Sequence, residues 1–328
     1  MNENLIIRLS SLGDIVHALP AFAALRRREP EARISWVVEP KGREILGLVE
    51  GLDEIITAGE PGWTSKLRRR CRIALDFQGL LKSAWIGWKS RSRRRLGFSA
   101  GNLREPAARW FYTETAPPFP EDGHVILKNL RMLEILGYKE TLVRFPLAVP
   151  GDLIRTAQER LSVLGWNPGL RPVIFNVGAA WPTKRWFPER WTETLRRLDR
   201  AGLFPAMLWG TEEERRTAEG VGRAAGVPVL PFFSVKETFG LLKSAALLVS
   251  GDTFALQAAS AVGLPAVAIF GPTNPRRNGP FTSRDRVVYH ELPCGRCYRR
   301  ACPDPRCLKA VDVDEVLEAI RDTLAPPQ

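Results

Sequence analysis

Short apolar runs alternate with amphipathic stretches along the whole chain. In the first half, four runs rich in β-branched and other apolar residues are typical of buried strands, at 5–10, 34–39, 54–58 and 73–77. The segments between or after these runs have helical periodicity, which predicts helices at 15–28, 41–49, 80–89 and 124–136. Buried strands that are each followed by a helix are characteristic of parallel sheets with right-handed crossovers.

The same rhythm restarts after a Pro-rich stretch at 115–123 and an extended segment at 145–152. In the second half we expect strands at 172–178, 204–210, 246–252 and 265–271. We expect helices there at 187–202, 212–226 and 253–263. The sequence therefore predicts an α/β protein of two Rossmann-like, doubly wound parallel-sheet domains that face each other across a cleft. The extended segment is the expected connection, giving domains at 1–150 and 151–328, the second with a terminal helix.

The length of 328 residues suits two domains of ordinary size. No apolar run reaches the roughly 18 residues of a transmembrane helix. The first residues also lack the basic and apolar regions of a signal peptide. These features predict a cytoplasmic protein.

The formal net charge of +12 favours acidic partners: nucleic acid, an anionic membrane surface or an anionic substrate. Two basic clusters stand out, at 66–72 and 89–95. A solvated face without any partner explains such clusters equally well. The chain has no zinc-finger, RNA-recognition or basic-zipper pattern, which makes a nucleic-acid binder the weakest of the candidate functions.

Unusual polar residues follow the expected strands, where the ligands of open α/β sheets bind. They are Asp14, Asp76, Gln78, Lys82, Lys184, Arg185, the three glutamates at 212–214, Asp252 and Thr253. Taken singly, the acidic residues and the threonine are explained by helix capping, and the cations by surface exposure. Taken together, carboxylates, cations and helix N-termini from both halves fit a bound diphosphate and a reacting hydroxyl better than unrelated caps do.

Several common enzyme classes lack their signatures here. There is no GxGxxG after the first strand, which argues against a dinucleotide-dependent redox enzyme. There is no GxxxxGK[ST], which argues against a P-loop kinase. With three histidines in the chain, a His-based metal or triad site is also disfavoured.

Four cysteines are spaced C-x2-C-x4-C-x4-C, at Cys294, Cys297, Cys302 and Cys307. In a reducing compartment this clustering suggests a metal before a disulfide, and a small zinc knuckle is geometrically possible. The alternative is a loop of reduced thiols. In either case we expect a structural role.

Four stretches, in this order, resemble the ADP-heptose:lipopolysaccharide heptosyltransferases of glycosyltransferase family nine. They are "IIRLSSLGDIVHALPAFAALRRREPEARISWVVEP", "LDFQGLLKSA", "GAAWPTKRWFPERW" and "SGDTFALQAASAVGLPAVAIFGPTNPRRNGPF". The resemblance covers about residues 4–310 and is strongest to the heptosyltransferase I branch. It implies a GT-B fold and inverting transfer of a heptose from ADP-heptose to a Kdo sugar of the lipopolysaccharide inner core. It also implies work at the cytoplasmic face of the inner membrane, through peripheral contact, without a cofactor or nucleic acid.

The resemblance also implies roles for individual residues. Asp14 matches the proposed catalytic base, which takes the proton of the acceptor hydroxyl, and Lys184 matches the lysine that contacts the diphosphate. The donor is expected at Gly178, Thr183, Lys184, Glu212, Asp252, Thr253 and Gly271. The acceptor is expected at Ser11, Gly13, Gln78 and Lys82, in the N-terminal domain. No metal is expected to take part in the reaction.

One motif departs from the family pattern. Family members commonly read Asp-Thr-Gly-x-x-His after the penultimate strand, where this chain reads "DTFALQ", with Phe254 for Gly and Gln257 for His. Phe adds bulk where glycine permits close backbone approach, and Gln cannot be charged. The alternatives are therefore another family-nine transferase, such as heptosyltransferase II, or a catalytically silent homologue that binds a nucleotide or lipopolysaccharide.

Overall fold

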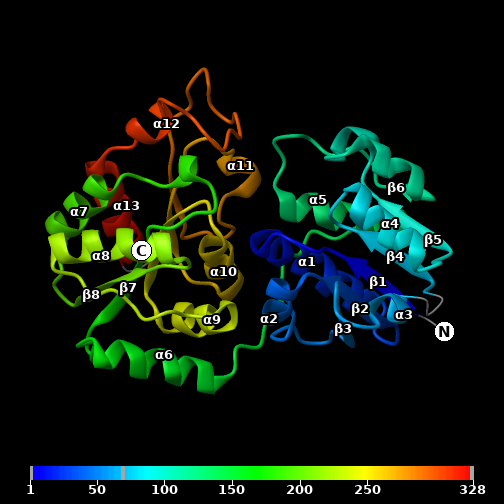
Figure 1. The fold of residues 1–328 in the computed structure, drawn as a ribbon, viewed down its shortest axis with the longest axis horizontal. Coiled ribbons are helices and arrows are strands. Elements are labelled where there is room, and N and C mark those ends of the chain that lie inside the picture. Colours follow the sequence, from blue (N-terminus) through cyan, green and yellow to red (C-terminus); the bar gives the residue numbers. More distant parts are fainter. Residues whose placement is uncertain (1–2, 68–70, 326–328) are drawn as a thin grey trace. The chain divides into compact units, whose positions relative to one another are not determined.

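The computed structural model describes residues 3–67 and 71–325, and the chain forms two compact units. Unit 1 is Met1–Ala148 and unit 2 is Val149–Gln328 (Figure 1). The change of unit falls two residues before the boundary that the sequence suggested. Across the described residues, every helix is too short or too polar to cross a membrane.

Unit 1 is built on a six-stranded sheet in the order β3-β2-β1-β4-β5-β6, with parallel pairing throughout. The strands are β1 (Glu3–Ile7), β2 (Arg33–Val38), β3 (Glu54–Thr57), β4 (Ile73–Asp76), β5 (Arg94–Gly97) and β6 (Glu114–Thr115). The chain leaves β1 toward β2 and later returns to β4 on its other side. The strand order therefore reverses between β1 and β4, which is where an open α/β sheet binds its ligands.

The helices of unit 1 cover both faces of this sheet because the crossovers run outward in both directions. The α-helices are α1 (Leu12–Arg28), α2 (Arg43–Leu46), α3 (Trp63–Leu67), α4 (Leu81–Lys89) and α5 (Val125–Arg131). The 3₁₀ helices are η1 (Pro40–Gly42), η2 (Ala100–Asn102), η3 (Pro106–Phe111) and η4 (Met132–Leu136). Helix α1 packs against α5, whereas α4 packs against β1, β4 and β5.

Unit 2 repeats the design with a five-stranded parallel sheet in the order β11-β10-β9-β7-β8. Its strands are β7 (Arg171–Asn176), β8 (Leu203–Leu208), β9 (Leu247–Gly251), β10 (Ala266–Ile269) and β11 (Arg286–Val288). Here the order reverses between β7 and β9. The loops that follow these two strands are the expected ligand edge of unit 2.

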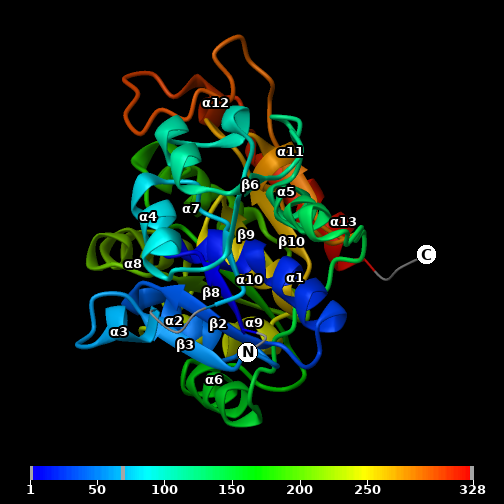
Figure 2. The ribbon, with the colours of Figure 1, turned by 90° about the vertical axis from the view of Figure 1, so that its right-hand side faces the viewer.

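The sheet of unit 2 is enclosed by helices that pack in two groups. Its helices are α6 (Gly151–Val163), η5 (Pro182–Lys184), α7 (Pro188–Arg197), α8 (Glu212–Ala225), α9 (Val235–Ser244), α10 (Phe254–Val262), α11 (Pro275–Asn278), α12 (Arg306–Lys309) and α13 (Val313–Leu324). Helices α6 and α9 lie side by side, as Figures 1 and 2 show. Helices α7, α8 and α13 share one apolar cluster with the sheet.

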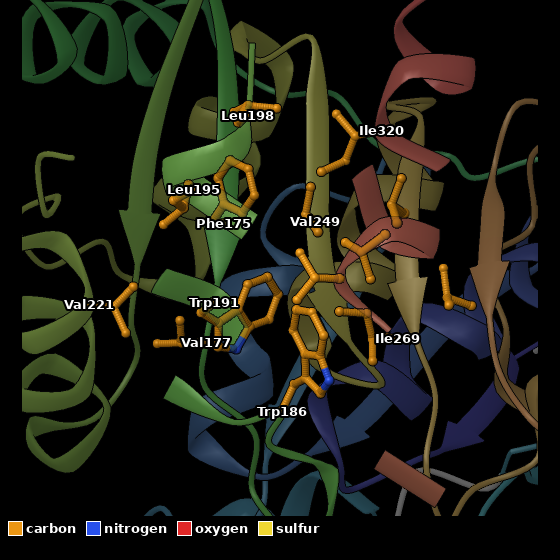
Figure 3. Packing of buried hydrophobic residues seen from close by; sticks show 14 of the residues in the cluster. Phe175, Val177, Trp186, Trp191, Leu195, Leu198, Val221, Val249, Ile269 and Ile320 are labelled. Carbon is orange, nitrogen blue, oxygen red and sulfur yellow. The ribbon is translucent and has the colours of Figure 1, made fainter. Parts of the chain in front are cut away.

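Aromatic side chains form the centre of that cluster. Trp186 and Trp191 meet edge to face with ring centroids 5.1 Å apart, and Trp191 meets Phe175 of β7 in the same way at 6.2 Å (Figure 3). Such pairs add about 0.5–1.5 kcal/mol beyond the burial of the rings. The cluster therefore fixes the 177–187 loop, which leads from β7 to α7, against the sheet.

The eight predicted strands are confirmed, and so is the order of strands and helices in both halves. The helix predicted at 41–49 is wrong in extent, because only Arg43–Leu46 is α-helical and a 3₁₀ turn precedes it. The helix predicted at 187–202 ends at Arg197. The structure adds β5, β6, α6, α9 and β11, which the pattern did not predict.

Candidate functional site

Asp14 lies in the first turn of α1, at the reversal point of the unit 1 sheet. Its Oδ2 accepts hydrogen bonds from the backbone N (3.2 Å) and the hydroxyl (2.8 Å) of Ser11. The same oxygen lies 2.7 Å from the Arg8 guanidinium, and the Asp14 side chain is 37% exposed. Asp14 therefore has the geometry of a helix cap and is also partly exposed, so its capping role does not exclude a chemical one.

The surroundings of Asp14 keep its carboxyl ionised. Burial alone would raise the pKa, but the positive charges of Arg8 and His17 and the hydrogen bonds from Ser11 hold it at about 2, below the ordinary 3.8. Arg8 is itself mostly buried, 13% exposed, on the loop after β1. Asp14 is therefore a carboxylate, able to accept a proton or a hydrogen bond, throughout the neutral range.

The loop after β4 is organised by a buried carboxylate, Asp76. It accepts hydrogen bonds from the backbone N of Gln78 and Gly79 and from the hydroxyls of Ser83 and Tyr112, at 2.6–3.2 Å. Burial raises the pKa of Asp76 in spite of these bonds. Asp76 is 2% exposed, so its hydrogen bonds support the loop from within.

Gln78 joins the two loops at this reversal point, because its Oε1 accepts a 2.7 Å hydrogen bond from the backbone N of Leu9. Lys82, in the first turn of α4, forms an exposed ion pair with Glu39 at 2.9 Å. The structure thus places Ser11, Gly13, Asp14 and Gln78 on neighbouring loops of unit 1. Lys82 lies beside them and is tied to the loop after β2.

In unit 2, Lys184 and Asp252 form an ion pair across the reversal point. The Lys184 ammonium lies 2.6 Å from Asp252 Oδ2, and the two side chains are 15% and 10% exposed. The same ammonium lies 4.3 Å from the centre of the Trp181 ring, which also carries the Arg300 guanidinium at 5.1 Å. Two cations therefore gather on one indole beside the N-terminus of α10.

A small polar network holds that helix N-terminus to β7. Asn176, the last residue of β7, donates from its amide nitrogen to the hydroxyls of Ser250 (3.0 Å) and Thr253 (3.1 Å). Thr253 is the N-cap of α10 and accepts from the backbone N of Leu256. Thr253 therefore has the capping role that its sequence position allows, and it lies next to Asp252.

The three glutamates at the start of α8 have different surroundings. Glu212 is 57% exposed and pairs with Arg215 of its own helix, while Glu213 pairs with Arg185. Glu214 is buried and accepts hydrogen bonds from the backbone N of Gly210 and Thr211. Glu212, which is expected to bind the donor, is therefore exposed in the structure. Glu214 is the glutamate that organises the loop.

The two predicted donor-site glycines are explained by close packing. A Cβ on Gly178 would lie 2.2 Å from the carboxyl carbon of Glu214. A Cβ on Gly271 would lie 2.8 Å from the side chain of Leu308 in α12. Substitution at either position would displace a buried neighbour, whether or not a ligand is present.

The cysteine segment packs onto the same edge of unit 2. The buried Thr183 hydroxyl donates to the carbonyl of Arg299, and the backbone N of Tyr298 donates to the carbonyl of Pro272. Cys294, Cys297 and Cys302 are exposed free thiols, whereas Cys307 is buried. Within 3–67 and 71–325, no three His, Cys, Asp or Glu side chains are grouped as a metal site requires.

Phe254 and Gln257, which depart from the family motif, both have partners inside unit 2. The Phe254 ring packs edge to face on the buried Phe239 of α9, with centroids 5.8 Å apart. The Gln257 amide donates to the carbonyl of Asn278 at 2.8 Å. The extra bulk of Phe254 is therefore taken up by the contact between α9 and α10.

Two residues of these edges were not singled out in the sequence: Arg8 and Asn176. Arg8 directly follows the apolar strand β1, and Asn176 is the last residue of the apolar strand β7. That position is the signal that identifies Asn176, since an amide at the end of a buried strand needs partners. The partners of these residues lie far away in the sequence, and no local pattern predicts them.

The chain is similar in sequence to known glycosyltransferases. The family described as "Glycosyltransferase family 9 (heptosyltransferase)" matches residues 64–307. Lipopolysaccharide heptosyltransferase 1 of Pseudomonas aeruginosa is 28% identical over 320 residues, covering 91% of this chain and 86% of the relative. Its counterpart in Escherichia coli K12 is 28% identical over 305 residues, covering 86% and 92%.

Solved structures show the same fold. E. coli heptosyltransferase WaaC with ADP has a TM-score of 0.76 at 22% identity, covering 98% of this chain and 99% of that one. A family 9 glycosyltransferase of Veillonella parvula has a TM-score of 0.83 at 20% identity, covering 98% and 97%. The predicted GT-B class of fold, with two parallel-sheet α/β domains, is confirmed. Since the family match spans most of the chain, this protein belongs to glycosyltransferase family 9, the heptosyltransferase family.

Proposed function

We propose that this protein transfers a heptose from ADP-heptose, with inversion, to a Kdo residue of the lipopolysaccharide inner core. The observation that carries the proposal is the set of charged residues at the reversal points of the two sheets. An ionised carboxylate, Asp14, occupies the one in unit 1, and an ion pair, Lys184–Asp252, occupies the one in unit 2. The names of the relatives, lipopolysaccharide heptosyltransferases, support the choice of sugar and acceptor.

In this proposal unit 2 binds the nucleotide sugar. The Lys184 ammonium offsets the charge that develops on the leaving diphosphate, and Asp252 holds the lysine and the donor sugar. The N-terminus of α10, capped by Thr253, supplies backbone N–H groups and a positive dipole end to the phosphates. No cofactor is required, because the positive charge comes from the protein.

Unit 1 binds the acceptor and supplies the base. The acceptor hydroxyl oxygen forms the new bond to the anomeric carbon while the bond from that carbon to the diphosphate oxygen breaks, releasing ADP. The hydroxyl proton passes to Asp14. A carboxylate with a pKa near 2 can accept this proton because the hydroxyl becomes strongly acidic as its oxygen binds carbon. The proton transfer therefore occurs late in the reaction. Ser11, Gly13, Gln78 and Lys82 border the acceptor.

The acceptor is anionic and lies in a membrane, so we also propose peripheral contact with the cytoplasmic face of the inner membrane. The net charge of +12 supports an anionic partner. Of the two basic clusters, the one at 66–72 includes 68–70, which lie outside the described residues. The cluster at 89–95 lies on unit 1.

The proposal is tested by incubating the protein with ADP-heptose and heptose-free Kdo-lipid A and reading the product by mass spectrometry. We expect one added heptose. Transfer only to an acceptor that already carries heptose would identify a heptosyltransferase II. Equally weak binding of ADP-heptose and unrelated nucleotide sugars, with no product, would overturn the assignment and leave the fold standing.

Arg8→Gln is expected to shift the acid side of the pH–activity profile upward. Without the guanidinium, burial and the remaining neighbours set the pKa of Asp14, which rises from about 2 toward or above the ordinary 3.8. In the wild type, Asp14 stays ionised and its stabilising interactions persist until the pH falls through about 2. The measurement is kcat/KM against pH in both proteins. Arg8→Lys should restore the wild-type profile, and an unchanged profile in Arg8→Gln would exclude this role for Arg8.

Phe254→Gly is expected to destabilise the protein more than it alters donor binding. Loss of the contact with Phe239 should lower the free energy of unfolding by about 2–4 kcal/mol. Donor affinity should change by about tenfold or less, or about 1.4 kcal/mol. Calorimetry with ADP-heptose and thermal unfolding measure the two effects, with Phe254→Leu as the control. A large gain in heptose transfer would instead mean that Phe254 closes the heptose pocket.

A further inference from the structure

One side of α4 carries large apolar side chains that remain exposed. Leu81, Trp85 and Trp88 are 42%, 40% and 51% exposed, and their spacing of four and three residues puts them in one stripe. Trp110 of η3, which packs against α4, is 87% exposed. We call these four residues the tryptophan face. The other side of α4, with Ala84 and Ile86, is buried.

Exposed tryptophans on adjoining elements are unusual in a folded protein. Trp is highly buried on average, and each ring brings a large apolar area. By contrast, Trp186 and Trp191 of unit 2 are 3% and 1% exposed. An exposed apolar patch of this kind marks an interaction surface.

The charge around the tryptophan face is strongly positive. Residues 81–111 contain eight Lys and Arg and one carboxylate, Glu105, which accepts a hydrogen bond from the backbone N of Leu81. The Lys89 ammonium lies 5.2 and 5.5 Å from the ring centres of Trp85 and Trp88. The partner of this surface must therefore be both apolar and anionic.

Part of the basic cluster at 89–95 does not contribute to this surface. Arg94 forms a two-bonded ion pair with Glu114, and Arg95 donates to the carbonyls of Phe111 and Ser92. These two arginines hold β5 in place. The exposed cations of the segment are Lys89, Arg91, Arg93, Arg104, Arg109 and Lys82, of which Lys82 pairs with Glu39.

We propose that the tryptophan face inserts into the interfacial layer of an anionic phospholipid bilayer. Tryptophan suits that layer because its ring is apolar and its N–H remains available to the headgroups. The surrounding cations are attracted to anionic headgroups. The inference specifies the surface that makes the membrane contact in the proposed function. Because α4 follows the Gln78 loop directly, insertion would hold the expected acceptor edge of unit 1 at the bilayer.

Two other occupants fit this surface less well. Single-stranded nucleic acid also stacks on aromatic rings among cations, but it does so along a groove that tracks its backbone. The tryptophan face is instead the outward side of a helix and includes the aliphatic Leu81. A second copy of the chain would bring a further six exposed cations against the first six, which opposes association.

The test is co-sedimentation with vesicles of phosphatidylcholine, alone or with about one third phosphatidylglycerol, in the absence of any acceptor. We expect binding to the mixed vesicles, and a loss of about tenfold or more in Trp85→Ser/Trp88→Ser and in Trp110→Ser. Lys89→Glu/Arg93→Glu should lose binding to the mixed vesicles as well. Phe232→Ser, which removes a 54% exposed side chain of unit 2, is the matched control and should bind as the wild type does.

A second readout shows whether the rings enter the bilayer. Lipids brominated in the acyl chain should quench part of the tryptophan emission in the wild type and less of it in Trp85→Ser/Trp88→Ser. Unchanged vesicle binding in both tryptophan variants would overturn the proposal. Two further results would overturn the proposal if vesicle binding of the tryptophan variants stayed the same. One is that these variants lose binding to an oligonucleotide. The other is that they lose a dimer that the wild type forms in sedimentation. Transfer to detergent-dispersed acceptor tests the proposed reaction separately.

Discussion

Asp14→Asn is expected to reduce turnover by about two to four orders of magnitude, the usual contribution of a general base. The amide keeps the size of the side chain and can still accept from Ser11, but it cannot take a proton from the acceptor hydroxyl. Donor binding should stay nearly intact and the protein should still fold, although loss of the ion pair with Arg8 lowers its unfolding free energy. Single-turnover rates with ADP-heptose, together with ADP affinity by calorimetry, measure the two parts of this expectation.

Asp152→Asn is the matched control for this substitution. Asp152 lies in the first turn of α6, so it shares with Asp14 a place near a helix N-terminus, where an acidic side chain favours the helix dipole. It should lose no activity. If Asp14→Asn kept activity within a few-fold of the wild type, as Asp152→Asn should, Asp14 would be a helix cap and the base would have to be sought elsewhere.

Lys184→Met is expected to act on both stability and donor binding. It leaves Asp252, which is 10% exposed, without its cation, and breaking such a pair costs about 3–5 kcal/mol. It also removes the charge-assisted contact proposed for the diphosphate. We therefore expect a lower unfolding free energy and weaker binding of ADP and ADP-heptose, measured by denaturant unfolding and calorimetry.

The double variant Lys184→Met/Asp252→Asn separates the two effects. Removing both charges should restore much of the unfolding free energy, because no buried carboxylate is left unpaired. ADP affinity should not recover with it. Lys243→Met, in the last turn of α9, is the control for loss of a helical lysine of unit 2 that is not part of the proposed donor site. Full ADP affinity in Lys184→Met would remove Lys184 from the donor site.

The sequence predicted the fold well wherever burial determined the residue pattern. Strands β1, β4 and β9 are buried along their whole length, β7 is buried except at Arg171, and each of the four contains a continuous apolar run. Strand β5, with the sequence RRLG, has no such run, and its two arginines indicate only a basic cluster. Its arginines are stabilised by Glu114 and by backbone carbonyls of a later segment, which no local pattern shows.

The site was predicted less completely than the fold. The position of a polar residue after a strand can be predicted from the sequence, and Asp14, Lys184 and Asp252 do lie at the reversal points. Which of them pair cannot be predicted, because Lys184 and Asp252 are 68 residues apart. The three glutamates of α8 looked equivalent, but burial distinguishes only Glu214.

The strictly parallel pairing of both described sheets has a consequence for folding kinetics. No two neighbouring strands are joined by a short hairpin, so each pairing first requires a long loop to close. The contact between Leu9 and Gln78 spans 69 residues, and that between Asn176 and Thr253 spans 77. Both candidate edges therefore depend on high contact order, which slows folding. Each edge forms only after the chain between its two loops has folded. A slow-folding variant should therefore regain ligand binding late, after most of its helix content has returned.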